Sequence, residues 1–197
     1  QCGCIVKEII LIGGGGHCKS VIDVIEQEGQ FKIVGIVDRP ELLGTDVLGY
    51  SVIGNDANLE SLAKIHTYAL VTVGHIRSPA PRIKLFDIAT EAGFVLPSII
   101  SPRAYVSQHA FIGKGVVVMH DALINAEATI GNNCIINSKA LIEHDTKILE
   151  HCHISTSVTI NGGVTIESGC FIGSGVTTRE SIAIKKNSFI KAGSIVK

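Results

Sequence analysis

The sequence contains no tryptophan, and aromatic residues make up only 5% of its 197 residues. Globular cores usually depend on large aromatic side chains, so part of this chain must pack small aliphatic residues instead. A charge excess is also missing, because 17 basic residues face 18 acidic ones. This balance excludes the basic surface expected of a protein that binds nucleic acid or an anionic membrane. No apolar run approaches the length of a membrane span.

The amino-terminal residues Gln1–Cys4 show neither an initiating methionine nor the basic and apolar regions of a signal peptide. We expect them to be an added segment or the cut edge of a longer chain. Without a secretion signal, the six cysteines are more consistent with free thiols than with disulfides. The sequence therefore predicts a cytoplasmic protein.

A six-residue period runs through the second half of the chain. From Ile100 to Val196 every sixth residue is isoleucine or valine, except Thr178, and the residue four places later is mostly small. Such a period predicts a parallel β-helix, in which each hexapeptide supplies a short strand and a turn and three hexapeptides form one triangular coil. The β-branched residues should point inward and the small residues should occupy the corners.

Three cysteines follow the same period at the spacing of one full coil. They are predicted to stack at one corner, where a free cysteine serves as a small buried residue. A metal ladder is the alternative that we consider less consistent with this pattern. The three residues are Cys134, Cys152 and Cys170.

Residues 8–97 alternate short apolar runs with helical patterns, which predicts a small parallel sheet covered by helices. The chain is therefore expected to contain an α/β Rossmann-like domain at 1–97 and a β-helix at 98–197. The expected strands are Glu8–Ile12, Lys32–Val37, Tyr68–Val73 and Phe94–Leu96, and the expected helices are His17–Glu28, Ala57–Ile65 and Pro81–Ala92.

A glycine turn, Gly13–Gly16, joins the first expected strand to the first helix. It matches the first two glycines of the dinucleotide motif G-x-G-x-x-G, but Cys18 occupies the third position. A glycine turn at a helix N-terminus, followed by Asp38 at the tip of the next strand, still predicts an anion and ribose site. We expect His17 to reach toward a substrate there. The alternative is a tight turn that binds nothing.

Three motifs together resemble a known family. They are G-G-G-G-H-C-K-S-V-I-D-V-I from Gly13, I-V-G-I-V-D from Ile33 and N-S-K-A-L-I-E-H-D from Asn137. From about Lys7 to Val196 the chain is similar to the NeuD/PglD-type sugar acyltransferases. The resemblance implies a left-handed β-helix after the Rossmann-like domain, and a homotrimer with active sites between the β-helices of neighbouring chains.

The resemblance also implies an activity. The family transfers an acetyl group from acetyl-CoA, and this chain is expected to acetylate the amino group of a nucleotide-linked amino sugar of the UDP-4-amino-sugar type in bacterial surface-glycan biosynthesis. No metal is implied. The remaining partners would be copies of the chain itself.

Site residues are carried over motif by motif from the resemblance. It implies that His144 is the general base, that Asp145 raises its basicity and that Asn137 lies near the acceptor. The residues implied to contact acetyl-CoA are His153, Ser174 and Ala192, and those implied to contact the nucleotide sugar are Gly15, Gly16, His17, Asp38, Arg39 and Gly74. Gly162 is also expected on the acetyl-CoA side, because its position one coil from His144 leaves room for the thioester.

The residues around His144 favour the same role without the resemblance. His144 lies between two acids and at a turn position that Ala126 and Gly162 occupy one coil away, so little side chain should surround it. An imidazole with a pKa near 6.5 can accept a proton from an amine at neutral pH. A neighbouring carboxylate would fix its tautomer. The alternative is an ordinary surface histidine.

Three other functions fit part of the sequence. O-acetylation of sialic acid would use the same fold, although the glycine turn with Asp38 and Gly74 favours a nucleotide-activated acceptor. A zinc hydratase of the γ-carbonic-anhydrase kind would use histidines such as His144, His151 and His153, but that class lacks the N-terminal domain. A solenoid that binds sugar nucleotides without turnover is the third alternative.

Overall fold

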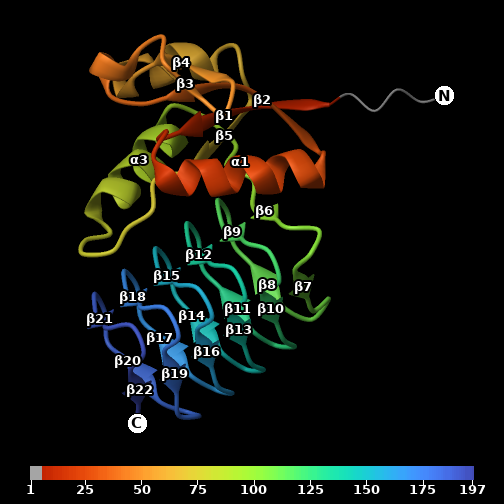
Figure 1. The fold of residues 1–197 in the computed structure, drawn as a ribbon, viewed down its shortest axis with the longest axis vertical. Coiled ribbons are helices and arrows are strands. Elements are labelled where there is room, and N and C mark those ends of the chain that lie inside the picture. Colours follow the sequence, from red (N-terminus) through yellow and green to blue (C-terminus); the bar gives the residue numbers. More distant parts are fainter. Residues whose placement is uncertain (1–5) are drawn as a thin grey trace, which may run out of the picture. The chain divides into compact units, whose positions relative to one another are not determined.

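The computed structural model describes residues 6–197, so Gln1–Cys4 lie outside the described residues. The chain forms two compact units (Figure 1). The first comprises the chain up to Val73 together with Lys84–Pro97, and the second comprises Gly74–Ile83 together with Ser98–Lys197. The segment Gly74–Ile83 therefore belongs to the second unit, although it lies inside the range 1–97.

The first unit contains a five-stranded sheet in the order β3-β4-β2-β1-β5, parallel except for the β3–β4 pair. Helix α1 ends at Gly29, whose left-handed backbone (φ 71°) lets its N–H bond the carbonyl of Ile25. The elements up to the β-helix are β1 (Lys7–Ile12), α1 (Gly16–Glu28), β2 (Phe31–Val37), β3 (Asp46–Val47), β4 (Tyr50–Gly54), α2 (Leu59–Ala63), β5 (Tyr68–Val71) and α3 (Ala80–Glu91), with 3₁₀ turns at Pro40–Leu42 and Asp56–Asn58.

Most of the expected elements of this unit are confirmed, with two corrections. The strand expected at Phe94–Leu96 is wrong, because Val95 makes only an isolated bridge to Tyr68. Strands β3 and β4 were not expected. Asp46 and several neighbours are exposed, so this hairpin lacks the apolar run that marks a buried strand.

The second unit is a parallel β-helix of two-residue strands, one every six residues. They form three sheets, which we name after one strand of each: the β13 sheet (β7, β10, β13, β16, β19, β22), the β14 sheet (β8, β11, β14, β17, β20) and the β15 sheet (β6, β9, β12, β15, β18, β21). The strands are β6 (Ile99–Ile100), β7 (Tyr105–Val106), β8 (Phe111–Ile112), β9 (Val117–Val118), β10 (Leu123–Ile124), β11 (Thr129–Ile130), β12 (Ile135–Ile136), β13 (Leu141–Ile142), β14 (Lys147–Ile148), β15 (His153–Ile154), β16 (Thr159–Ile160), β17 (Thr165–Ile166), β18 (Phe171–Ile172), β19 (Thr177–Thr178), β20 (Ala183–Ile184), β21 (Phe189–Ile190) and β22 (Ile195–Val196).

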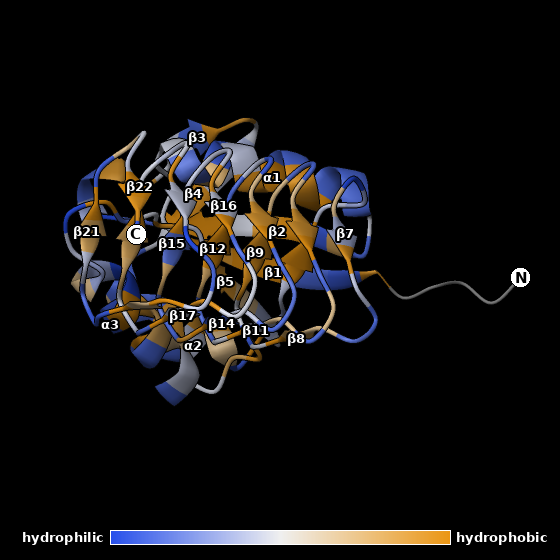
Figure 2. Cartoon of the chain, turned by 90° about the horizontal axis from the view of Figure 1, so that it is seen from below, coloured by the Kyte–Doolittle hydropathy of each residue, from blue (hydrophilic) through white to orange (hydrophobic). Residues whose placement is uncertain are grey.

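The core of the β-helix confirms the six-residue pattern. The second residue of each strand stacks on its equivalents one coil away, as Ile124 pairs with Ile142 and Ile142 with Ile160. These residues and the small corner residues form one buried cluster. Figure 2 shows hydrophobic residues along the strands and mostly hydrophilic residues in the turns.

The cysteine column is buried, as expected, and its thiols also act as hydrogen-bond donors. Each thiol donates to a main-chain carbonyl in the equivalent turn of the next coil: Cys134 to Leu149 (3.1 Å), Cys152 to Glu167 (3.2 Å) and Cys170 to Lys185 (3.0 Å). Hydrogen bonding to a neighbouring sulfur and burial raise the pKa of Cys152 and of Cys170, so these two thiols stay protonated. These bonds join each cysteine to the next coil, and the carbonyl of Lys185 also accepts a hydrogen bond from Ser188 N (3.1 Å).

Within residues 6–197, no helix is both long and apolar enough to cross a membrane. The four cysteines of this range are free thiols.

Candidate active site

The glycine turn between β1 and α1 is held tightly at its start and open at its end. Gly13 has φ +104°, and a Cβ there would lie 2.3 Å from Val73 Cγ2. In contrast, a Cβ on Gly15 or Gly16 would meet no atom within 4 Å. The open part of the turn therefore coincides with the N-terminus of α1, where main-chain N–H groups favour an anion.

Asp38, directly after β2, holds this turn in place by hydrogen bonds. Its Oδ2 accepts a hydrogen bond from Gly14 N (2.5 Å) and its Oδ1 accepts one from Arg39 N (2.7 Å). The expected ribose acid is thus also a structural residue of the turn, a role that sequence reasoning missed. The side chain of Arg39 is 70% exposed beside Glu41.

Cys18, which replaces the third glycine of the dinucleotide motif, is fully buried. Burial raises the pKa of its thiol to about 11. His17 precedes it in the first turn of α1 and is partly buried. Gly74 is the first residue of the segment assigned to the second unit.

His144 lies in the turn between β13 and β14, which we call the His144 corner together with the equivalent turns after β16 and β19. Its side chain is 65% exposed, and Nδ1 lies 2.7 Å from Asp145 Oδ2. This hydrogen bond, with the charges of Asp145 and Glu143, raises the pKa of His144. Asp145 has φ 59°, a left-handed backbone that aspartate tolerates better than most residues.

The His144 ring packs against Gly162, which has no side chain. A Cβ on Gly162 would lie 2.8 Å from His144 Cε1 and 2.9 Å from Nε2. Around the ring is an open hollow of about 680 Å³, lined by His144 and its acidic neighbours with the following residues of the next two coils: Asn161, Gly162, Gly163, Glu180 and Ser181. The predicted gap beside His144 is therefore present.

Asn137 lies at a different place, the turns after β12, β15, β18 and β21, which we call the Asn137 corner, and His153 of β15 lies beside it. Asn137 Nδ2 is 3.3 Å from His153 Nε2, and Asn137 Oδ1 accepts a hydrogen bond from Ser138 N (2.8 Å). Further along this corner, Ser174 contacts Ser155 (2.9 Å between the hydroxyl oxygens). Ala192 follows in the next turn.

The contacts of His153 fix its tautomer. Its Nδ1 lies 2.7 Å from the carbonyl oxygen of His75, and because a carbonyl only accepts, Nδ1 must carry the proton. Burial lowers the pKa of His153 to about 4, so the ring is neutral at pH 7 and Nε2 is an acceptor. Asn137 therefore donates to Nε2.

The two corners lie at opposite ends of the strands of the β13 sheet, since Asn137 precedes β13 and His144 follows it. One strand and parts of two turns separate Asn137 from His144, far more than the roughly 3 Å over which a base takes a proton. Gly162, expected to contact acetyl-CoA and to lie beside His144, lies against the ring of His144. Within one chain the site residues of the β-helix thus form two separate groups.

Comparison with known proteins identifies both parts of the chain. The PglD N-terminal domain family matches residues 8–87, and the bacterial transferase hexapeptide family (six repeats) matches residues 109–144 and 145–180. A mutant of perosamine N-acetyltransferase from Caulobacter crescentus, in complex with CoA and GDP-perosamine, is 32% identical with a TM-score of 0.91, over 98% of this chain and 89% of that one. The chain belongs to the NeuD/PglD-like sugar acyltransferases.

Two further solved structures are similar to this acyltransferase. The acetyltransferase domain of PglB from Neisseria gonorrhoeae FA1090 is 31% identical with a TM-score of 0.90, over 97% of this chain and 91% of that one. WeeI from Acinetobacter baumannii AYE, at 17% identity and a TM-score of 0.53 over 97% of both chains, shares the fold alone. A search of curated proteins found no match. These similarities confirm the expected α/β domain followed by a left-handed β-helix.

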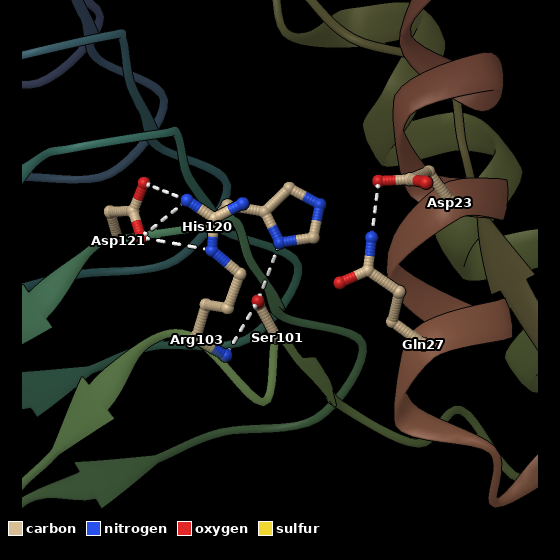
Figure 3. A network of polar contacts seen from close by, with 6 residues as sticks. All are labelled: Asp23, Gln27, Ser101, Arg103, His120 and Asp121. Carbon is tan, nitrogen blue, oxygen red and sulfur yellow. Dashed lines mark hydrogen bonds and ion pairs between the residues drawn. The ribbon is translucent and has the colours of Figure 1, made fainter.

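The other histidines of this acyltransferase lie elsewhere. His120 Nδ1 contacts Ser101 Oγ (2.7 Å), next to the ion pair of Arg103 and Asp121 (Figure 3), and His66 contacts Glu8. His151 Nδ1 contacts Asn133 Nδ2 (3.1 Å). Residues 6–197 contain no group of three side chains placed to hold a metal ion.

Apart from Gly74, sequence reasoning missed the segment Gly74–Ile83 as part of the site. It supplies the His75 carbonyl that orients His153, and it is anchored by the buried Arg82, whose Nε donates to the carbonyl of Asn133 (3.1 Å). Nothing in the local sequence signals this packing, because the contacts join residues more than fifty positions apart.

Proposed function

We propose that this chain is an acetyl-CoA-dependent N-acetyltransferase that acetylates the amino group of a nucleotide-linked amino sugar. The observation that carries the proposal is the His144–Asp145 pair beside Gly162, an imidazole with a fixed tautomer on an open wall. The similar perosamine N-acetyltransferase binds CoA and GDP-perosamine, which supports both substrate classes. In this proposal residues 1–97 bind the nucleotide sugar and residues 98–197 carry the acetyl transfer.

His144 acts as the general base. Asp145 holds the proton of a neutral ring on Nδ1, so Nε2 presents its lone pair on the Gly162 side. An attacking amine must lose a proton as its nitrogen bonds the thioester carbon, and Nε2 accepts that proton while the coenzyme thiolate departs. Asp145 then stabilises the imidazolium.

Asn137 supplies a donor for the thioester oxygen. Its amide has two N–H groups, of which one is given to His153 and the other has no partner among residues 6–197. His153 has only an acceptor at Nε2, so it orients Asn137 and is itself oriented by the His75 carbonyl. A donor held in advance stabilises the negative charge that develops on the carbonyl oxygen. Ser174 and Ala192 extend the same corner along the coenzyme.

The active site forms between copies of the chain in a homotrimer. The His144 corner of one copy faces the Asn137 corner of the next, because one β-helix holds these groups at opposite ends of the strands of the β13 sheet. Tyr105 and Ile195, in the first and last strands of this sheet, are exposed. All outward residues of the sheet are uncharged: Tyr105, Leu123, Leu141, Thr159, Thr177 and Ile195. An uncharged face bordered by both half-sites suits a closed cyclic assembly.

The acceptor binds at the N-terminal domain through Gly15, Gly16, His17, Asp38, Arg39 and Gly74, and a UDP-linked 4-amino sugar is the acceptor that we propose. A GDP-linked amino sugar is the second candidate, since the similar Caulobacter enzyme binds GDP-perosamine. We place the reaction in the cytoplasm, where free thiols such as the four buried cysteines persist.

Release of the coenzyme thiol tests the function. Acetyl-CoA is mixed with UDP-, GDP- and CMP-linked amino sugars and with free sialic acid, and His144→Gln serves as the matched inactive variant. The proposal predicts thiol release with a nucleotide-linked amino sugar and its loss in the variant. Turnover of free sialic acid alone would establish O-acetylation instead.

A further inference from the structure

A cavity of about 440 Å³ lies in the second unit between the segment Gly74–Ile83 and the last coils of the β-helix. Its volume is in the range of small-molecule sites. The proposed chemistry uses none of its lining residues except the main chain of His75. They are His75, Ile76, Arg77, Ser78, Pro79, Ala80, Ile83, Gly169, Phe171, Lys186, Asn187, Ser188 and Phe189.

One wall of the cavity is aromatic. The rings of Phe171 and Phe189 are stacked at 5.2 Å with an interplanar angle of 15°, and Phe189 is 49% exposed. A ring held flat and half open to solvent can stack on a further planar ring. Ile76 on the same cavity is 60% exposed, so this wall leaves apolar surface uncovered.

His75 is a buried polar group on this cavity whose hydrogen bonding is incomplete. Its side chain is 95% buried, since only 5% is exposed, and neither ring nitrogen has a hydrogen-bond partner within residues 6–197. Burial and the nearby His153 and Arg82 lower the pKa of His75 to about 4, and the main chain of Cys170 opposes this shift to a smaller degree. The neutral ring therefore offers one donor and one acceptor. Buried polar groups are normally satisfied, whereas this ring has only its contact with the main chain of Cys170, so a ligand group would complete its hydrogen bonding.

Two cations border the cavity without an ion pair. Neither Arg77 nor Lys186 forms a salt bridge with any residue from 6 to 197, although the main-chain N–H of Lys186 donates to Glu167 Oε2 (2.8 Å). The adjacent Lys185 Nζ lies 3.2 Å from Glu167 Oε1. Unpaired cations beside an aromatic wall are the features that bind a phosphate attached to a planar ring.

We propose that this cavity binds a nucleoside phosphate, with its base on Phe189 and His75 and its phosphate on Arg77 and Lys186. The base would stack on the open ring of Phe189, beside His75, whose buried ring nitrogens would bond it after the side chain turns toward the cavity. The nucleotide has two sources: the nucleotide end of acetyl-CoA, which rests on the proposed function, or a separate free nucleotide.

Phe189→Trp provides a local probe, because the chain has no other tryptophan. Adenosine 3′,5′-bisphosphate, ADP and UDP are titrated against its fluorescence, and calorimetry on the chain with Phe189 intact checks that the probe does not alter the site. We expect saturable quenching by at least one nucleotide. Lys186→Met should weaken that binding about tenfold, the usual effect of removing one charged hydrogen-bond partner, and Arg77→Met should act similarly. The matched control Lys185→Met should bind within about twofold of the parent, because its charge already serves Glu167.

Turnover with acetyl-CoA and with acetyl-pantetheine separates the sources. If Lys186→Met raises the KM for acetyl-CoA but not for acetyl-pantetheine, the coenzyme supplies the nucleotide. If both KM values are unchanged while free nucleotide binds more weakly, the cavity is a separate nucleotide site. The proposal is overturned if no nucleotide quenches the tryptophan, or if Lys186→Met and Lys185→Met bind alike. Because binding is measured without turnover, that failure is distinct from failure of the proposed acetyl transfer.

Discussion

Replacing Gly162 with alanine tests whether the His144 imidazole works from the position in which the structure holds it. The added Cβ would lie 2.8 Å from His144 Cε1 and 2.9 Å from Nε2. The ring must therefore retreat by about 0.6 Å to regain ordinary contact, and misplacing a catalytic group by about 1 Å can lower the rate about 10²-fold. Ala126 occupies the same turn position two coils before Gly162, so the backbone itself accepts a Cβ. We expect Gly162→Ala to lower kcat about tenfold to a hundredfold.

The assay is steady-state release of the coenzyme thiol, with thermal unfolding and size measurement on the same samples. Ala126→Gly is the matched control, since it makes the opposite change at the equivalent position one coil before His144, and it should leave kcat within about twofold. A Gly162→Ala variant with parental kcat and an unaltered melting temperature would refute the assignment of His144 as a base that works against this wall.

Three further changes test other parts of the site. Asp145→Asn removes the carboxylate that raises the pKa of His144, so the acidic limb of the kcat–pH profile should move to lower pH and kcat should fall about tenfold, less than the about 10²–10⁴-fold typical of removing a general base; an unmoved limb would contradict the pairing. Asp38→Asn should raise the acceptor KM about tenfold and leave the KM for acetyl-CoA unchanged, and equal effects on both would argue against a nucleotide-sugar site at the glycine turn. Cys152→Ala removes the thiol that donates to the Glu167 carbonyl and should lower the free energy of unfolding by about 1 kcal/mol or more, with Cys152→Ser losing less; the reverse order in denaturant melts would show that packing alone matters.

The regular part of the fold could be predicted because one short pattern repeats. A β-branched residue at every sixth position predicts where each strand and each turn lies and which side chain points inward, for all coils. Ile124, Ile142 and Ile160 stack as that pattern requires. Strands β3 and β4 carry no such signal. They are short, with Asp46 exposed, and the pairing of β4 with β2 and of β3 with β4 depends on tertiary contacts.

The site was only partly predictable for a related reason. His144, its acidic partner and the Gly162 wall lie at fixed coil spacings, so the sequence predicts their proximity. Asn137 belongs to the same linear motif as His144 but lies across a strand, at the other corner. The His75 carbonyl that orients His153 comes from a segment seventy-eight positions away, which no local pattern reveals.

Mixed trimers test most directly the claim that each active site forms between two copies. His144→Ala and Asn137→Ala chains carry different affinity tags, are produced together, and are purified through both tags so that every trimer contains both variants. In any such cyclic trimer, one of the three interfaces joins an intact His144 corner to an intact Asn137 corner. A shared active site predicts that two inactive variants together recover about one third of the parental kcat per trimer. Activity no higher than that of the separate variants, in trimers shown to contain both chains, would contradict a shared site.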